Sequence, residues 1–327
     1  MKKVLITGIN GQDGSYLAEL LLENGYQVFG LLRAGSHEPL SRIQHLTGQI
    51  ELIEGDITDL DSLTKLFKST QPDEVYNLAA QSHVGLSFEQ PVMTAQITGV
   101  GAVNVFEAAR VNAPQARIYQ ASSSEMFGDS ADEDGCQRET TRMDPASPYA
   151  CAKVFAYLLA KSYRAAYGMF ISNGILFNHE SPRRGINFVT NKVCREAVRI
   201  KLGLAERMQI GNLDVQRDWG HARDYVRAMW LMLQQERPDD FVCATGISHT
   251  VQELVEYVFG RVGLDWNELI DIDPTLIRSE DRRQLKVDSS RLRNTTGWSP
   301  TYTFESMLDE MIEYWQTEFS DAETATA

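Results

Sequence analysis

Short apolar runs alternate with helical patterns along the first half of the chain. Residues 4–6 form a run of Val, Leu and Ile that predicts a buried strand, and residues 15–24 carry apolar positions at helical spacing. The alternation continues with strands expected at 27–32, 74–78 and 116–120 and helices at 61–69 and 98–111. Because the strands are continuously apolar, we expect an α/β fold whose doubly wound parallel sheet has helices on both faces.

The second half carries helical patterns between longer loops. Helices are expected at 190–202 and 222–235, and apolar residues at helical spacing predict an amphipathic helix over 304–319. We predict a large N-terminal domain over 1–172, joined by part of 212–240, and a smaller C-terminal domain over 173–320. The two can interleave, since the chain can cross between them again. Residues 321–327 are expected to form a disordered tail.

Composition and charge narrow the classes of partner. The chain has 327 residues, of which 43% are hydrophobic and 23% charged, as in ordinary globular proteins. A net charge of −14 argues against a surface for nucleic acid or acidic membrane. The net charge does not exclude a small phosphate ligand, because binding of such a ligand depends on the charges of the residues in its own cleft.

Cysteine spacing and hydropathy suggest the compartment. The four cysteines are scattered, so we expect neither a disulfide framework nor a bound metal. The N-terminal apolar run is too short for a signal peptide, and no later run has the length of a transmembrane helix. A cytoplasmic protein is therefore the expectation.

A glycine-rich turn follows the first expected strand. Gly8, Gly11 and Gly14 would allow a tight turn, close approach of the backbone to a pyrophosphate and close packing of helix on strand. Gln12 and Asp13 lie between them, where the helix N-terminus offers free amides to an anion. The pattern predicts a dinucleotide site, and its GxxGxxG spacing is typical of short-chain dehydrogenase folds.

The end of the second strand bears on the choice of cofactor. An acidic residue there would favour NAD, but this chain has Arg33 followed by Ser36, which favours the 2′-phosphate of NADP. The alternative is a solvated loop charge at Arg33 and NAD as the cofactor. Further expected cofactor contacts are Asp56, Ile57, Leu78, Ala79, Ala80 and Ser82.

A serine, a tyrosine and a lysine form the candidate catalytic group. Tyr149 and Lys153 are four residues apart on an expected helix, so they share one face. We expect the ammonium to lower the pKa of the phenol and make it a general base. Ser123, at the end of the preceding strand, can bridge the phenol and a substrate oxygen. The alternative for the Tyr–Lys pair alone is a surface contact, but the glycine turn and Ser123 favour catalysis.

Several longer sequence motifs resemble those of a known family. ITGINGQDGSYLAELLLENGY, YNLAAQSHVGLSFEQP, NHESPRRG and RDWGHARDYV are similar to GDP-mannose 4,6-dehydratases, a family of the extended short-chain dehydrogenase/reductase group. The similarity runs from residue 3 to about residue 260. It implies a Rossmann-type fold with bound NADP, a smaller C-terminal α/β substrate domain for a GDP-sugar, and a homodimer or homotetramer.

The resemblance also implies residue roles. Ser123, which replaces the family's threonine, Glu125, Tyr149 and Lys153 fall on catalytic positions, and Tyr149 and Lys153 also contact the cofactor. His179 and Arg184 match positions used around the cofactor. The implied substrate contacts are Ser82, Ser124, Glu125, Asn178, Val189, Lys192, Arg217, Arg278 and Asp281.

Two departures from the family pattern concern specificity. Ala34 stands where the family has a second arginine, which weakens the 2′-phosphate site and leaves room for NAD. The family motif RPxE corresponds here to Arg278-Ser279-Glu280-Asp281. The acidic residue that contacts the nucleotide ribose is therefore Asp281, or it is displaced.

Glu125 separates the candidate reactions. In a 4,6-dehydratase, Tyr149 would take the 4-hydroxyl proton and Glu125 the carbon-5 proton, so that the 6-hydroxyl leaves as water. An epimerase or 4-keto-reductase would need only Ser123, Tyr149 and Lys153, and Glu125 could then be a structural ion pair. A binding protein without chemistry would require a broken catalytic group. A GDP-heptose remains an alternative substrate.

Overall fold

The computed structural model describes residues 1–33, 40–276 and 286–326, and the side chains only as far as residue 321. A sheet of seven strands forms its centre, in the order β11-β7-β5-β4-β1-β2-β3, with every neighbouring pair parallel. The strands are β1 (Lys3–Thr7), β2 (Gln27–Leu32), β3 (Glu51–Glu54), β4 (Glu74–Asn77), β5 (Arg117–Ser123), β7 (Ile171–Leu176) and β11 (Asp240–Cys243). The chain order reverses between β1 and β4, as in a doubly wound Rossmann-type sheet.

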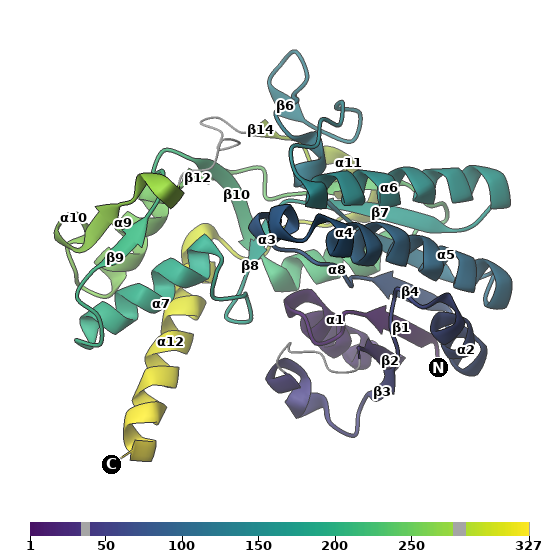
Figure 1. Ribbon diagram of the computed structural model, residues 1–327, viewed down its shortest axis with the longest axis horizontal. Coiled ribbons are helices and arrows are strands. Elements are labelled where there is room, and N and C mark those ends of the chain that lie inside the picture. The colour runs from purple at the N-terminus through teal and green to yellow at the C-terminus, as the bar shows by residue number, and fades with distance from the viewer. Residues whose placement is uncertain (34–39, 277–285, 327) are drawn as a thin grey trace.

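Helices cover both faces of this sheet (Figure 1). One face carries α1 (Gln12–Glu23) and α8 (Ala222–Leu233), which pack against each other. The other carries α2 (Leu60–Thr70), α5 (Gly101–Asn112) and α6 (Pro148–Tyr167). Short helical segments on this second side are α3 (Val84–Glu89), α4 (Pro91–Thr94) and the π-helix η2 (Ala95–Val100).

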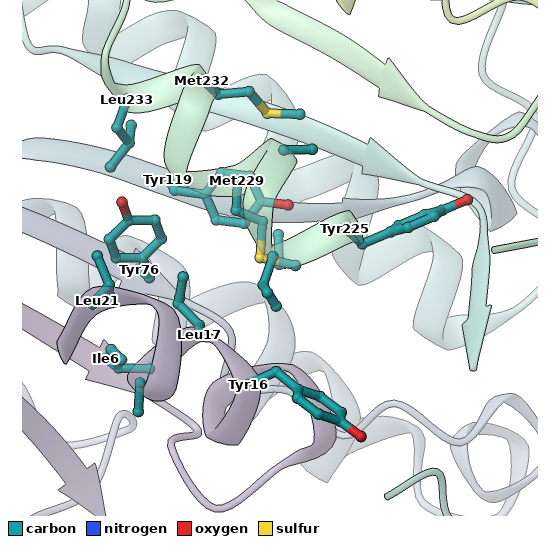
Figure 2. Packing of buried hydrophobic residues seen from close by; sticks show 14 of the residues in the cluster. Ile6, Tyr16, Leu17, Leu21, Tyr76, Tyr119, Tyr225, Met229, Met232 and Leu233 are labelled. Carbon is teal, nitrogen blue, oxygen red and sulfur yellow. The ribbon is translucent and has the colours of Figure 1, made fainter. Parts of the chain in front are cut away.

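The core under α1 and α8 is closely filled. Figure 2 shows Leu17 and Leu21 of α1 and Met229 of α8 around Tyr76 and Tyr119 of the sheet. All five side chains are buried. Burial of a large apolar side chain stabilises a fold by about 1.5–3 kcal/mol, so this layer holds the two helices firmly on the strands.

A second, smaller lobe holds most of the elements after β7. Its core joins α7 (Val189–Lys201), α9 (Val251–Arg261) and α12 (Phe304–Thr326), which lie together away from the large sheet (Figure 1). Its remaining elements are α10 (Trp266–Leu269), β9 (Met208–Ile210), β13 (Ile270–Ile272), β8 (Asn178–Glu180), β10 (Gln216–His221), β12 (Ser248–Thr250) and η4 (Pro274–Leu276). The chain returns to the sheet for α8, β11 and α11 (Ser290–Thr296).

Several expected elements end elsewhere in the structure. The first residues of the helix expected over 98–111 belong to the π-helix η2, which joins α4 to α5 through residues with right-handed helical dihedrals. Helix α12 continues to Thr326, through most of the segment expected to be a disordered tail. Outside the large lobe's layers lie η1 (Leu40–Leu46), η3 (Ser124–Phe127), and the two-stranded pair β6 (Cys136–Gln137) with β14 (Lys286–Val287).

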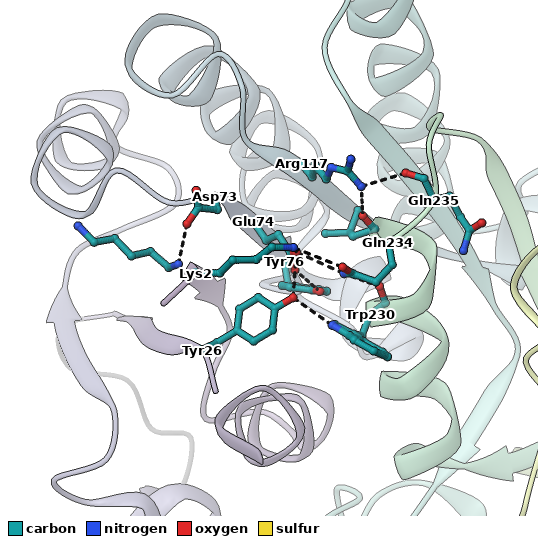
Figure 3. Close-up of polar contacts among 11 residues, drawn as sticks. Lys2, Tyr26, Asp73, Glu74, Tyr76, Arg117, Trp230, Gln234 and Gln235 are labelled. Carbon is teal, nitrogen blue, oxygen red and sulfur yellow. Dashed lines mark hydrogen bonds and ion pairs between the residues drawn. The ribbon is translucent and has the colours of Figure 1, made fainter. Parts of the chain in front are cut away.

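A buried carboxylate joins α8 to the sheet at the amino end of the strands. Glu74 is 1% exposed and accepts hydrogen bonds from Lys2 Nζ at 3.0 Å, Tyr26 Oη at 3.1 Å and Tyr76 Oη at 2.9 Å. Trp230 of α8 donates to Tyr26 Oη at 3.2 Å (Figure 3). Removing one partner of such a buried charge is costly, so we interpret this cluster as structural.

In the described part of the chain, none of the helices combines the length and the hydropathy that crossing a membrane requires.

Candidate active site

A cleft of about 740 Å³ opens at the carboxyl ends of β1, β4 and β5, between the two lobes. Ligands of open α/β sheets bind at this edge, where the strand order reverses. Most of the residues expected to bind cofactor or substrate line this one cleft, although they come from distant parts of the sequence.

The glycine turn between β1 and α1 forms one wall. Gly8 has a φ of +73°, and a Cβ there would lie 3.0 Å from the backbone nitrogen of Ala79. A Cβ on Gly14 would lie 2.3 Å from the carbonyl oxygen of Gly8. The N-cap of α1 is Gly11, which has no capping side chain, so the first amides of the helix have no side-chain acceptor at the cap. This arrangement fits a pyrophosphate.

A buried polar network behind the turn was missed by the sequence analysis. The Thr7 hydroxyl donates to Asn77 Oδ1 at 2.8 Å and accepts from the amides of Leu78 and Ala79 at 3.1 Å. Asn77 Nδ2 in turn donates to Gln120 Oε1 at 2.7 Å. These bonds tie the ends of β1 and β4 to the middle of β5, so they hold the wall formed by Leu78, Ala79 and Ala80. The only signal in the sequence was a polar residue at the end of each strand.

The expected 2′-phosphate end of the cleft is partly described. Arg33 is exposed at the end of β2 and lines the cleft together with Arg42, whose Nη1 donates to the carbonyl oxygen of Asn10 at 3.2 Å. Ser36 and Ala34 lie outside the described residues. The other expected contacts that line the cleft are Gln12, Asp13, Asp56, Ile57 and Ser82.

Tyr149 and Lys153 lie on the buried face of α6, at the base of the cleft. They are 8% and 5% exposed, and the Lys153 Nζ lies 5.7 Å from the centre of the Tyr149 ring. Nζ donates to the carbonyl oxygen of Ala121 at 2.7 Å. Together with Ser123 at the end of β5, these side chains form the group expected from the sequence.

The pKa of the phenol is shifted opposite to the expectation. Burial raises the pKa of Tyr149 to about 12, a hydrogen bond with Ser123 lowers it, and the charge of Glu125 raises it. Burial likewise lowers the pKa of Lys153 to about 8, although the charge of Asp13 opposes this shift. The expected lowering by Lys153 was therefore wrong for this structure, because loss of solvent outweighs the neighbouring charges.

Glu125 lies in η3, directly after β5. The Ser123 hydroxyl caps this turn by accepting from the Glu125 amide at 3.3 Å. Gly128 ends the turn with a φ of +50°, and a Cβ there would come within 1.7 Å of the carbonyl oxygen of Asp144. This close approach sets the path of the loop that places Glu125 and Ser124 in the cleft.

The segment that begins with β8 is bound to the N-terminus of α1. Gln12 Nε2 donates to the carbonyl oxygen of His179 at 3.1 Å, and Ser181 Oγ donates to Gln12 Oε1 at 2.8 Å. His179 Nε2 lies 2.9 Å from Asp13 Oδ2. Arg184 also lines the cleft, with its Nε 3.2 Å from Glu180 and its guanidinium over a neighbouring phenylalanine ring.

The expected substrate residues divide into three groups. Asn178, Val189 and Arg217 line the cleft from the smaller lobe. Lys192 is not among the residues that line it, because its Nζ donates to the carbonyl oxygen of Gln209 at 2.8 Å. Arg278 and Asp281 lie outside the described residues.

Arg183 lines the cleft although the sequence analysis did not select it. Its guanidinium donates to Ser15 Oγ at 3.0 Å and to Glu19 at 2.5 Å, and it covers the ring of Tyr16 at 4.0 Å. Its position beside Arg184 in the word NHESPRRG was the available signal. His83 also lines the cleft, and its Nδ1 accepts a hydrogen bond from the Leu86 amide at 3.0 Å.

Comparison with known proteins places the whole chain among similar sequences and folds. A family model for GDP-mannose 4,6 dehydratase matches residues 5–311. GDP-mannose 4,6 dehydratase 1 of Arabidopsis thaliana is 48% identical over 324 residues, covering 95% of this chain and 89% of the relative. The structure of RMD from Pseudomonas aeruginosa complexed with NADPH is 25% identical with a TM-score of 0.80, covering 97% of this chain and 100% of that chain. That of dTDP-glucose 4,6-dehydratase from Bacillus anthracis in complex with NAD shares the fold at 21% identity, with a TM-score of 0.84 and 98% of both chains covered.

Proposed function

The chain belongs to the GDP-mannose 4,6-dehydratase family, and from this premise we propose that it is a lyase that converts GDP-mannose to GDP-4-keto-6-deoxymannose. The observation that carries the proposal is the convergence of Ser123, Tyr149, Lys153 and Glu125 on one cleft beside a dinucleotide turn. The large lobe would bind the cofactor and the smaller lobe the sugar nucleotide, with Asn178, Val189 and Arg217 as its contacts.

The residues of the cleft divide the chemistry among them. Tyr149 Oη takes the proton of the sugar's 4-hydroxyl, and the Ser123 hydroxyl holds that oxygen. The Glu125 carboxylate then removes the carbon-5 proton, and the 6-hydroxyl leaves as water with a proton from Glu125 or Ser124. When bound, the oxidised nicotinamide would supply a positive charge to the cleft and would carry the hydride from carbon 4 to carbon 6. The Tyr149 hydroxyl then returns its proton to carbon 5, so that the loss of one water balances and Tyr149 regains its starting state. Lys153 holds Tyr149 in a cleft from which burial excludes water.

We propose NADP as the cofactor. Arg33 and Arg42 line the outer end of the cleft, and charge-assisted bonds from arginine suit a phosphate. A structural relative was solved with NADPH, which agrees with this choice, whereas the more distant dehydratase was solved with NAD.

Replacement of Arg33 tests the cofactor. The Arg33→Ala variant loses one charge-assisted contact, about 1.5–3 kcal/mol, so its affinity for NADP falls roughly ten- to hundredfold while its affinity for NAD stays unchanged. Equilibrium binding of both dinucleotides to wild type and variant provides the measurement. Mainly NAD in an extract of the denatured wild-type enzyme would contradict the proposal.

We also propose a homodimer in which α6 pairs with its copy. Phe155 is 46% exposed and Leu158 is 53% exposed on one side of this helix, where Cys151 and Ala165 continue an apolar stripe. Val100 is exposed nearby on the adjacent π-helix, which packs on α6. An exposed apolar stripe along a helix of 20 residues is typical of an interface between subunits.

The reaction itself has a direct test. We expect the purified enzyme to convert GDP-mannose to a product lighter by one water, detected by mass spectrometry, without consumption of added NADPH. A parallel incubation with a GDP-heptose measures the preference for the hexose. Stoichiometric oxidation of NADPH without loss of water would instead indicate a 4-keto-reductase.

A further inference from the structure

Both ring nitrogens of His179 lie against hydrogen-bond acceptors. Nδ1 is 2.8 Å from the carbonyl oxygen of Phe177, and Nε2 is 2.9 Å from Oδ2 of Asp13. Carbonyl and carboxylate oxygens only accept hydrogen bonds, so both nitrogens must donate. A neutral imidazole carries a single N–H, and the geometry therefore requires the doubly protonated ring.

We propose that His179 is an imidazolium whose charge compensates Asp13 at the glycine turn, and that this pair makes the affinity for the dinucleotide depend on pH. The inference rests on the proposed function, because the ligand is the anionic nicotinamide dinucleotide. His179 then acts as a positioning and charge-compensating residue.

The place of Asp13 explains why compensation matters. Asp13 lies in the first turn of α1, beside the uncapped amides that fit a pyrophosphate. The helix dipole favours a carboxylate there, but an uncompensated carboxylate would repel the phosphates. With His179 charged, the pair has no net charge. The arginines that line the cleft then determine the sign of the charge that the phosphates meet.

The surroundings favour the ionised form of both members of the pair. Burial by itself lowers the pKa of His179, but the charge of Asp13 and its hydrogen bond raise that pKa above its ordinary value, against the opposing charge of Arg184. Burial raises the pKa of Asp13, but His179, a hydrogen bond from Gln12 and the charge of Arg184 lower it below its ordinary value.

Groups on other elements also face the pair. From α8, the Tyr225 ring stacks on the imidazole with ring centres 4.6 Å apart. From α6, Tyr149 and Lys153 lie within electrostatic reach of Asp13. As the pH rises past the raised pKa of His179, the imidazole loses its charge while Asp13 keeps its own, and the cleft gains one negative charge.

The binding test compares matched variants. Equilibrium dialysis measures NADP binding to wild type, Asp13→Asn and His179→Gln between about pH 6 and about pH 9. Wild-type affinity should fall by up to about tenfold per pH unit above the His179 pKa. Asp13→Asn should flatten this slope and keep its affinity at high pH, whereas His179→Gln should bind weakly throughout. The 2′-phosphate of NADP titrates in the same way with wild type and both variants. The test is therefore the difference between their slopes of binding affinity against pH.

A second measurement does not depend on the cofactor. Nitrogen NMR of the histidine rings, assigned by loss of a signal in His179→Gln, should show two protonated nitrogens at neutral pH. The control His45→Gln removes an exposed histidine paired with Glu19 and should leave the binding slope unchanged. A neutral ring for His179, or equal slopes in wild type and Asp13→Asn, would overturn the inference. Wild type that shows the charged ring but binds no NADP would refute the proposed cofactor instead.

Discussion

At the residue scale, burial controls the protonation of the two central groups. Tyr149 and Lys153 are four residues apart on α6, and the loss of solvent favours the neutral form of both. The Tyr149 phenol therefore holds its proton at neutral pH, and Lys153 is close to losing its own. The negative charges of Glu125 and Asp13 raise the pKa of Tyr149 further, so the phenolate that the proposed mechanism needs depends on positive charge, which the bound oxidised nicotinamide would supply.

Glu125→Gln tests the elimination step at this scale. Glutamine keeps the size and polarity of the side chain but cannot accept the carbon-5 proton, so dehydration should fall about 10²- to 10⁴-fold. Mass spectrometry of the product and solvent deuterium at carbon 5 provide the measurements, and deuterium should no longer enter. Glu133→Gln, an exposed control, should keep wild-type activity. Near-normal dehydration by Glu125→Gln would show that Glu125 is structural.

Lys153→Met tests the cost of a buried ammonium. A pKa lowered from 10.5 to about 8 destabilises the folded state by roughly 3 kcal/mol below pH 8, and the penalty is relieved as the pH rises from about 8 to 10.5. The variant also loses the bond to Ala121, so we expect a net gain of about 2 kcal/mol at neutral pH. Urea unfolding at neutral and at alkaline pH measures the gain, which should shrink at the higher pH. Activity should be lost. A variant that is less stable at both pH values would contradict this account.

At the scale of elements, the short turn η3 places Glu125. Its geometry depends on Gly128, whose positive φ and contact with Asp144 leave no room for a side chain. The Glu125 carboxylate, which we propose as the elimination base, is thus positioned by backbone packing between two loops, rather than by a long helix or strand.

Gly128→Ala should therefore lower both stability and activity. We expect a loss of at least about 2 kcal/mol, since the new methyl group adds overlap to an unfavourable φ. Thermal unfolding and the dehydration rate report the two effects. The matched control is Gly135→Ala, where φ is +79° but nothing lies within 4 Å of the added Cβ. Equal losses in the two variants would show that contact with Asp144 is unimportant.

At the scale of the whole molecule, helix α6 connects the cleft with the surface of the proposed subunit interface. One face of this helix carries Tyr149 and Lys153 into the cleft, and another exposes Phe155 and Leu158. A subunit interface on that side would hold the helix that carries Tyr149 and Lys153.

The double variant Phe155→Glu with Leu158→Glu should convert the proposed dimer to a monomer, because two charges would be buried in an apolar contact. Light scattering coupled to gel filtration measures the mass. Ile247→Glu, at another exposed apolar position, should leave the mass unchanged. A wild-type monomer at micromolar concentration would exclude the proposed homodimer.

The sequence by itself determined the local features. Strand β2 spans the predicted residues, and the glycine turn follows β1 as expected, because apolar runs and glycine conformations act over a few residues. The spacing of Tyr149 and Lys153, together with Ser123 at the end of the preceding strand, also identified side chains that line one cleft, because this pattern is local. The π-helix η2 was not predicted, because the local pattern matches an ordinary helix.

Only the tertiary structure decided which residues meet and which charges they carry. Asp13 and His179 are 166 positions apart, so no local pattern could indicate that they pair. Lys192 does not line the cleft, because its Nζ donates a hydrogen bond to the carbonyl oxygen of Gln209 in β9. The pKa of Tyr149 rises instead of falling because solvent exclusion depends on every element packed around it, whereas spacing along a helix shows only one neighbour.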